Sequence, residues 1–191
     1  MNASSETGEK RLTRMALVRK RFARNKLAVA GLVILVAMFV LAFVGPFFGK
    51  HSWDSLDFFS LLQPPSKEHF FGTSQIGGDV YALTLRGLQK SLIIGILVAI
   101  FSTGLAAIAG GFAGFYGGKV DRSVMWIIDA LLVLPSFLII AVMSPWFRGR
   151  TWLIFVVLLA AFGWMITARI VRSATMSLRE RDFVRAAIYM G

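Results

Sequence analysis

Long apolar runs alternate with shorter polar segments along this chain. The first run, residues 27–48, reads LAVAGLVILVAMFVLAFVGPFF and contains no charged residue. At a rise of about 1.5 Å per residue, such a helix crosses a hydrocarbon core of about 30 Å. Three more apolar runs follow at residues 91–118, 123–147 and 152–174. The pattern predicts an all-α, polytopic membrane protein with four transmembrane helices.

The segment before the first run, residues 1–26, ends in a cluster of positive charge. Its basic residues are Lys10, Arg11, Arg14, Arg19, Lys20, Arg21, Arg24 and Lys26. The apolar residues among them, Leu12, Met15, Ala16, Phe22 and Ala23, fall near one face of a helix. This pattern predicts a basic amphipathic helix on an anionic membrane surface, with a solvated charged tail as the alternative.

The segment between the first two runs, residues 49–90, is predicted to be extracytoplasmic. Residues 50–81 within it are polar and broken by Gly and Pro, which predicts turns. A helical approach to the second span begins at about residue 79. Short connections at residues 117–122 and 148–150 join the later runs, and residues 175–191 follow the last one.

Composition and charge agree with a membrane protein and set its orientation. Hydrophobic residues make up 57% of the chain and its mean hydropathy is +0.70, beyond the roughly 45–50% apolar content of soluble domains. Lys and Arg gather on the cytoplasmic side of membrane proteins. A cytoplasmic N-terminus places 15 of the 21 Lys and Arg residues inside and 6 outside. The same asymmetry accounts for the net charge of +11, so nucleic acid is not needed as a partner.

The sequence offers no nucleotide, metal or catalytic site. The glycine-rich stretch GGFAGFYGGKVD, residues 110–121, departs from the phosphate-binding loop pattern in two positions and ends an apolar run instead of following a strand. His51 and His69 lack metal-ligand spacing, and the chain has no Cys. We therefore expect no cofactor and no metal in this chain.

Three of these glycines predict a helix contact. Gly110, Gly114 and Gly118 are four residues apart and would line one face of a helix, where they allow another helix to approach closely.

Two residues of the third span are unusual for a membrane helix. Asp129 is an ionisable group inside an apolar run, which indicates a transport pathway, a proton relay or a structural ion pair. We favour the ion pair, near the inner boundary of the membrane, with Arg122 or with an arginine of another subunit as its partner. Pro135 would bend the same span, which opens a pathway or fits curved packing, and we favour packing.

Three stretches carry a resemblance to a known family. HFFGTSQIGGDVYALTLRGLQKSL (residues 69–92), AGGFAGFYGGKVDRSVMWIIDALLVLPS (109–136) and WMITARIVRSATMSLRERDFVRAAIYMG (164–191) occur in the order found in dipeptide, oligopeptide and nickel permeases of ABC importers. Together they extend, with gaps, from residue 69 to residue 191. The chain most resembles the second permease subunit of a dipeptide system.

This resemblance implies a type I importer permease of six spans, of which residues 27–191 would supply four. The expected partners are a homologous second permease, two ATP-binding subunits that hold ATP and Mg²⁺, and an extracytoplasmic substrate-binding protein. The expected location is the plasma (inner) membrane of a bacterium, with several passes. The chain itself is then not an enzyme, because its partners hydrolyse the ATP.

The third stretch resembles the start of the family's cytoplasmic E-A-A loop, which forms a coupling helix that docks on the ATPase. By position, Ala186, Ala187 and Gly191 match the two alanines and the glycine of that motif. Arg185 stands where the motif has Glu, so we carry no role for that carboxylate over to it. The second half of the loop and the last two spans of the family do not occur in these 191 residues.

The cargo and the class of function have alternatives at this point. Peptides are the leading cargo, and nickel and haem are carried by importers of the same kind. An ion-gradient-driven transporter or channel would favour several ionisable residues within spans, whereas Asp129 is the clear instance here. A membrane scaffold without transport is the third reading.

Overall fold

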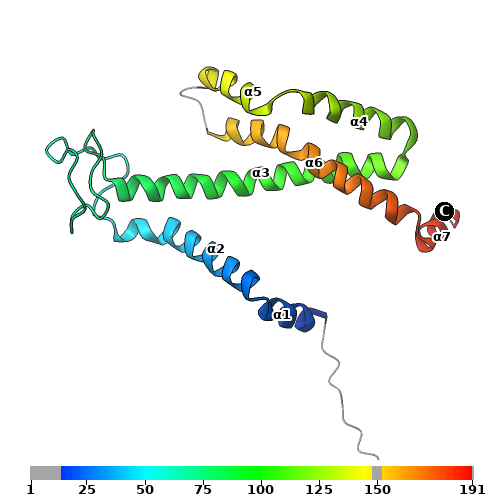
Figure 1. Cartoon of the computed structure of the whole chain (residues 1–191), viewed down its shortest axis with the longest axis horizontal. Helices are drawn as coiled ribbons and strands as arrows, with labels where there is room; N and C mark the ends of the chain where they lie inside the picture. The colour runs from blue at the N-terminus through cyan, green and yellow to red at the C-terminus, as the bar shows by residue number, and fades with distance from the viewer. Residues whose placement is uncertain (1–13, 148–151, 191) are drawn as a thin grey trace, which may run out of the picture. The chain divides into compact units, whose positions relative to one another are not determined.

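The computed structural model describes residues 14–147 and 152–190, and its regular elements are helices (Figure 1). They are α1 (Arg14–Arg24), α2 (Lys26–Val44), η1 (Gly45–Phe48), α3 (Val80–Tyr116), α4 (Gly118–Val133), α5 (Ser136–Met143), η2 (Ser144–Phe147), α6 (Leu153–Arg179) and α7 (Asp182–Tyr189). The β-structure in these ranges amounts to two isolated bridges within residues 56–79. The predicted all-α fold is confirmed. The chain divides into two compact units, residues 1–90 and 91–191.

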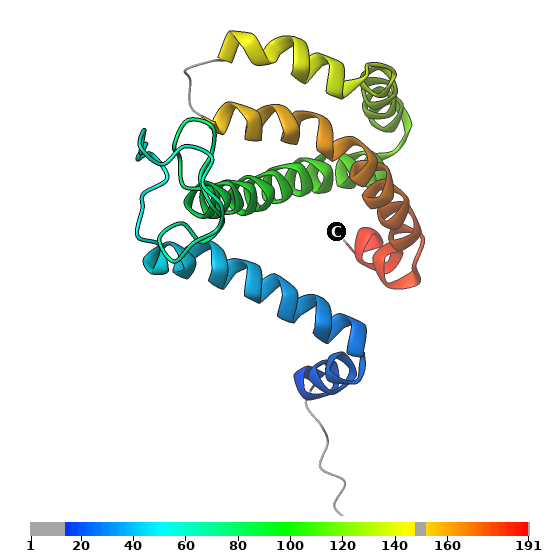
Figure 2. The same ribbon diagram turned by 60° about the vertical axis from the view of Figure 1, so that its left-hand side comes forward.

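Two helices at an angle begin the N-terminal unit (Figure 2). α2 starts after Asn25, whose side-chain oxygen accepts a hydrogen bond from the Ala28 N–H at 3.2 Å. Its apolar sequence continues through η1, and the two form a candidate membrane span, Lys26–Phe48, close to the predicted residues 27–48. Lys10, Arg11 and Leu12 of the predicted amphipathic helix lie outside the described residues.

The end of α2 is bonded to the first turns of α3. The Tyr81 hydroxyl donates to the Gly45 carbonyl at 3.0 Å, and the Gln89 amide donates to the Ala42 carbonyl at 2.7 Å. Both carbonyls belong to the last turn of α2 or the residue after it, where helical carbonyls lack partners within the helix. These bonds fix the junction of the two helices within the N-terminal unit.

The polar segment before α3 folds around a buried ionisable pair. His69 is 4% exposed and Asp79 is 5% exposed, and they join through Nδ1 and Oδ2 at 2.8 Å. The ring of His51 stacks on that of His69 with 4.4 Å between centroids. The sequence predicted only turns here, so this organisation is a finding of the structure.

Three helices pack around a small core in the C-terminal unit. The buried core residues are Ala106 of α3, Ile128 of α4, and Met165 and Ala168 of α6. Small side chains make up half of this core, so the three helix backbones lie close together there.

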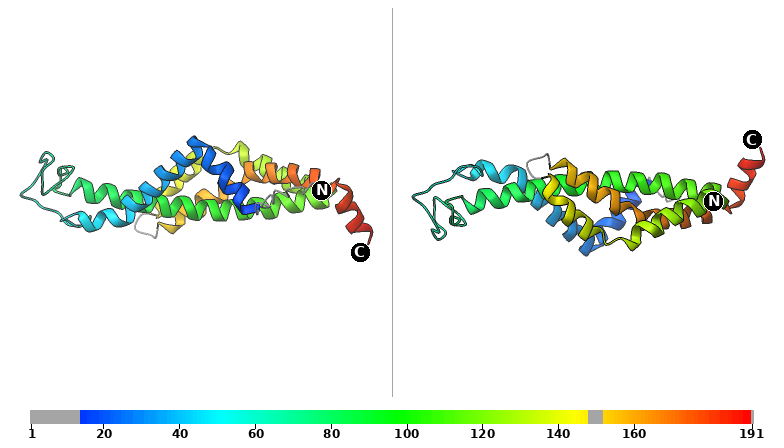
Figure 3. Two further views of the ribbon diagram at one scale, coloured as in Figure 1. Left: turned by 90° about the horizontal axis from the view of Figure 1, so that it is seen from below. Right: turned by 90° about the horizontal axis from the view of Figure 1, so that it is seen from above.

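The number of membrane spans depends on one broken helix. Within residues 14–147 and 152–190, three segments are long and apolar enough to cross a membrane, Lys26–Phe48, Val80–Tyr116 and Leu153–Arg179. A fourth span results if Gly118–Val133 and Ser136–Trp146 count as one, although they meet at an angle of 66° (Figure 3). Pro135 causes the break, because it lacks an N–H and forces the residue before it out of the helical region. The third predicted span, residues 123–147, is therefore not one straight helix.

The chain reverses direction between α3 and α4 at two glycines. Gly117 has φ +66° and Gly118 has φ +55°, values that other residues adopt only with strain. α4 begins at Gly118, so most of the predicted connection at residues 117–122 is helical instead. α6 likewise continues to Arg179, beyond the predicted end of the fourth span at residue 174.

Candidate functional site

Two glycines bring α3 into close contact with α6. A Cβ added to Gly110 would collide with the carbonyl oxygen of Ala168. A Cβ on Gly114 would lie 2.7 Å from the carbonyl oxygen of Arg172 and 2.8 Å from Cβ of Thr175. A larger residue at either position would require α3 and α6 to move apart. The four-residue spacing of these two glycines thus coincides with a close helix contact of the kind it predicts.

Gly118 is not part of this contact, which corrects the third member of the predicted glycine face. α3 ends at Tyr116, so Gly118 is the first residue of α4 and points along a different helix. No atom lies within 4 Å of a Cβ built there. Its positive φ, and not a neighbouring helix, accounts for a glycine at this position.

A bidentate ion pair joins α4 to α6. Both Nε and Nη2 of Arg172 donate to the carboxylate oxygens of Asp121. The two side chains are 28% and 19% exposed, so the pair is largely covered within the chain. Asp121 lies in the first turn of α4, where the helix dipole also favours negative charge. Arg172 thus contacts α4 through its side chain, and its backbone faces Gly114 of α3.

A second ion pair joins the same two helices further from the α3–α4 turn. Arg169 donates through Nη2 to Oδ1 of Asp129. Within the described residues the partner of Asp129 is therefore Arg169, and not the Arg122 suggested by the sequence. The Arg169 and Asp129 side chains are 47% and 63% exposed, in contrast to the covered pair.

Pro135 lies directly after α4, at the break that precedes α5. It has φ −68° and ψ 96°, and the preceding Leu134 N–H donates to the Leu131 carbonyl at 3.2 Å. The last carbonyls of α4 beyond this bond lack helical partners. The proline therefore creates a stretch of non-helical backbone within an otherwise apolar segment.

The predicted coupling residues belong to α7, which turns away from the end of α6 (Figure 3). Ala186 and Ala187 are exposed, and so are Phe183 (65%) and Met190 (84%). At about 100° per residue these four positions fall on one side of the helix. We call them the α7 apolar face. Arg185 is part of α7 but its side chain is not among the described ones, and Gly191 lies outside the described residues.

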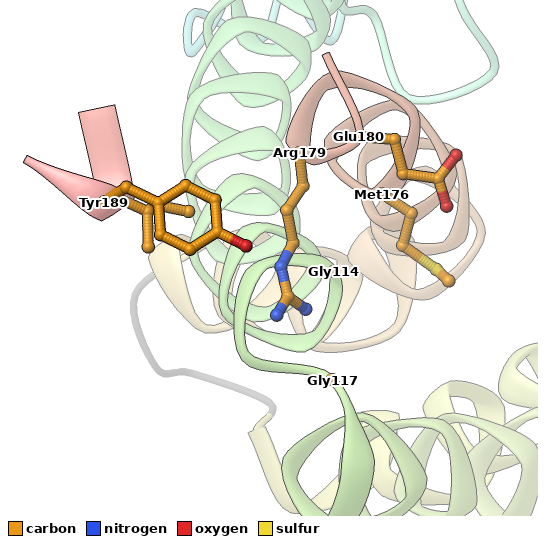
Figure 4. A pocket seen from close by; sticks show the side chains of 7 residues that line it. Gly114, Gly117, Met176, Arg179, Glu180 and Tyr189 are labelled. Atoms are coloured by element: carbon orange, nitrogen blue, oxygen red, sulfur yellow. The ribbon is translucent and has the colours of Figure 1, made fainter. Parts of the chain in front are cut away.

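A cleft of about 580 Å³ separates α7 from the α3–α4 turn. Its lining comes from Gly114 and Gly117 at the turn, from the end of α6 and from Ile188 and Tyr189 of α7. Figure 4 shows the Arg179 side chain extending toward the two glycines, with the Tyr189 ring on its other side. The α7 apolar face and this cleft involve different residues of the helix.

Sequence reasoning missed several of these residues. Arg169 and Arg172 were counted only as cytoplasmic charges, although their spacing of three residues would have placed them near one face of a helix. Phe183 and Met190 flank the two alanines at positions i and i+7, a spacing that would have indicated an apolar stripe. In residues 14–147 and 152–190, no group of three His, Asp or Glu side chains could hold a metal ion.

Two segments of the chain match known protein families. Residues 13–65 match the family described as the N-terminal TM domain of oligopeptide transport permease C. Residues 103–191 match the family described as binding-protein-dependent transport system inner membrane component.

Individual relatives agree with these matches. The oligopeptide transport system permease protein OppC of Mycobacterium tuberculosis is 52% identical over 94% of this chain and 62% of that protein. The dipeptide transport system permease protein DppC of Bacillus subtilis is 36% identical over 90% of this chain and 53% of that protein. The OppC protein of Haemophilus influenzae is 35% identical over 91% of this chain and 56% of its own length. The chain thus spans a little more than half the length of these relatives.

Proposed function

We propose that the chain forms part of an ATP-driven importer of peptides, because residues 13–65 match the N-terminal TM domain of oligopeptide transport permease C and residues 103–191 match the binding-protein-dependent transport system inner membrane component. The named cargo of its relatives, oligopeptides and dipeptides, supports this choice over nickel or haem. The observation that carries the proposal is the match of residues 103–191 to the transport component family, the region that contains both ion pairs and α7.

The proposed complex contains a homologous second permease, two ATP-binding subunits and an extracytoplasmic substrate-binding protein. ATP and Mg²⁺ bind to the ATP-binding subunits, so this chain supplies the pathway and not the hydrolysis. It lies in the inner membrane with its N-terminus in the cytoplasm. The excess of Lys and Arg on that side supports the orientation, and basic α1 would lie against the anionic lipid surface.

We propose α7 as the contact with an ATP-binding subunit. The α7 apolar face is exposed in the chain alone, and Ala186 and Ala187 at its centre allow a partner to approach closely. We include Arg185 and Gly191 in the proposed contact because of their positions in the sequence motif. Closure of the ATP-binding subunits would then move α7 together with the end of α6, which contacts it.

Reconstitution of the full-length permease with its partners tests this function. Proteoliposomes with ATP inside, and with the binding protein and tetra-alanine outside, should accumulate the peptide, whereas those with a non-hydrolysable ATP analogue inside should not. Accumulation driven by a proton gradient without ATP would contradict the proposal. Stable isolation of the permease without any ATP-binding subunit from cells that express all components would contradict the proposed assembly.

Variants of α7 test the coupling. Ala187→Trp places a large side chain at the centre of the α7 apolar face, and we expect peptide uptake to fall about tenfold or more, a loss typical of a disrupted interface centre. Ala187→Ser keeps the small volume and serves as the matched control, with uptake close to that of the wild type. Equal uptake by the Trp and Ser variants would exclude α7 as the coupling contact.

A further inference from the structure

The pair of Asp129 and Arg169 lies deep along its helices. Gly117, just before α4, and Arg179, at the end of α6, lie at about the same height along the two helices, because a Cβ on Gly117 would lie 3.4 Å from Nη1 of Arg179. From the start of α4 to Asp129, and from Arg169 to the end of α6, the rise is about 15 Å at 1.5 Å per residue. This is about half of a hydrocarbon core of 30 Å. Counted from the α3–α4 turn and from the end of α6, the ion pair therefore lies about midway along a span, whereas the sequence favoured the inner boundary.

This pair is exposed on the surface of the chain although its helices are apolar. The Asp129 and Arg169 side chains are 63% and 47% exposed, and Val133, one turn further along α4, is 81% exposed. Charged groups in contact with lipid tails are costly, so intramembrane ion pairs face protein or water. The pair of Asp121 and Arg172 is largely covered within the chain, so it does not need further protein or water around it.

The break before α5 lies on the next turn of the same helix. Leu134 and Pro135 leave the helical conformation six residues or fewer after Asp129. Non-helical backbone at membrane depth occurs where it is covered by protein or lines a water-filled cavity. The exposed Asp129 and the non-helical backbone thus lie within one short stretch, residues 129–135. A water-filled pathway along this stretch would solvate both the ion pair and the backbone groups at the break.

We propose that Asp129 and Arg169 line the aqueous pathway and contact the charged ends of the transported peptide, an inference that rests on the proposed import function. A free peptide carries an ammonium group and a carboxylate. Asp129 can accept hydrogen bonds from the ammonium group, and the guanidinium of Arg169 can bind the carboxylate through two N–H donors. When no peptide is present the two side chains neutralise each other, so neither charge is left unpaired.

Cysteine labelling tests the placement of this face in water. These 191 residues contain no Cys, so a single thiol can be introduced into the full-length permease after any cysteine elsewhere in it is replaced by Ser. Val133→Cys lies on the Asp129 face of α4, and Ile127→Cys lies about 200° around the helix from Asp129. Both native side chains are exposed in the chain and branched at Cβ, which makes them matched positions.

The assembled complex in membrane vesicles is treated with a membrane-impermeant, positively charged methanethiosulfonate reagent. We expect Val133→Cys to react at least about tenfold faster than Ile127→Cys, and tetra-alanine with the binding protein and ATP to slow the reaction. Equal or slower labelling of Val133→Cys would overturn the proposal. Because neither substitution changes the ion pair, this measurement does not depend on whether variants of the pair fold.

Peptides with free and blocked ends test the recognition. In Asp129→Asn, we expect uptake of tetra-alanine to fall about tenfold, the effect of losing roughly one charge-assisted contact. Uptake of N-acetylated, C-amidated tetra-alanine should stay within about twofold. Arg169→Gln should show the same selectivity. Equal losses for both peptides would overturn the recognition of charged ends.

The proposed import function and the pathway lining can fail separately. If the wild-type complex does not accumulate peptide with ATP, the proposed function is wrong. If it does, and Val133→Cys is labelled no faster than Ile127→Cys, only the pathway inference is wrong.

Discussion

Asp79 joins His69 to the first turn of α3 with the two oxygens of one carboxylate. Oδ2 bonds to Nδ1 of His69 at 2.8 Å, and Oδ1 accepts the Ala82 N–H at 2.8 Å. Oδ2 pairs with a buried imidazole nitrogen, and Oδ1 pairs with a backbone N–H at the start of a helix. Without Asp79 both groups would lack this partner. One residue therefore connects the fold of the polar segment to the position at which α3 begins.

Replacing Asp79 should loosen that segment. Asp79→Ala removes both bonds and leaves a buried histidine nitrogen without its partner, which costs about 1–3 kcal/mol. We expect a lower Tm of the purified complex and faster proteolysis within residues 50–79. Asp54→Ala is the control, since Asp54 is exposed and its carboxylate accepts a hydrogen bond from nearby Ser52 in the same segment. Identical behaviour of the two variants would contradict the structural role of Asp79.

Gly114→Ala should force α3 and α6 apart. The new methyl group would lie 2.7 Å from a backbone carbonyl that cannot move independently of its helix, and overpacking of this kind costs about 1–3 kcal/mol. A lower Tm of the complex is the expected result. Gly111→Ala provides the matched control, because no atom lies within 4 Å of its Cβ and alanine favours the helix. The close contact is refuted if Gly114→Ala is as stable as Gly111→Ala.

Asp121→Asn should destabilise the packing of α4 on α6. Arg172 would retain its charge in a largely covered place, and the loss of a charged hydrogen-bond partner costs about 2 kcal/mol. Thermal unfolding should show a lower Tm, which the reversed pair Asp121→Arg with Arg172→Asp should partly restore. Arg122→Gln is the control, because Arg122 carries a charge next to Asp121 but forms no ion pair within the described residues. Failure of Asp121→Asn to lower Tm below this control would refute the role of the pair.

Phe183→Ala should weaken the proposed contact of α7 with an ATP-binding subunit. Phe183 is the large aromatic side chain of the α7 apolar face, and truncation of such an anchor weakens binding by about tenfold or more. The measurement is the Kd of the purified subunit for the permease pair in detergent. Phe59→Ala removes an aromatic ring that is 98% exposed, in the segment expected on the opposite side of the membrane. Similar Kd values for both variants would argue against α7 as the docking helix.

The sequence allowed the helices and part of the site to be predicted, for physical reasons that also explain the misses. Apolar runs determine membrane helices by their length alone, and the Gly110–Gly114 spacing indicates a close contact wherever the two share a helix. Gly118 has the same spacing, but α3 ends at Tyr116, before the positive φ of Gly117, and backbone conformation does not show in the spacing. The partner of Asp129 was missed because Arg169 is 40 residues away and meets it only through the packing of α4 on α6.

The buried pair of His69 and Asp79 was missed for another reason. A segment rich in Gly, Pro and Ser has no periodicity that distinguishes an ordered fold from an open loop. Its order comes from individual polar contacts, which composition does not record.

The turn at Gly117 and Gly118 has a consequence for how the protein enters the bilayer. Only one residue separates the end of α3 from the start of α4, so no polar loop lies between the two helices. Lys119 and Arg122, in the first turns of α4, oppose passage of the turn across the membrane. With the proposed orientation, in which this turn is cytoplasmic, we expect α3 and α4 to enter the bilayer together as a hairpin whose closed end stays on the cytoplasmic side.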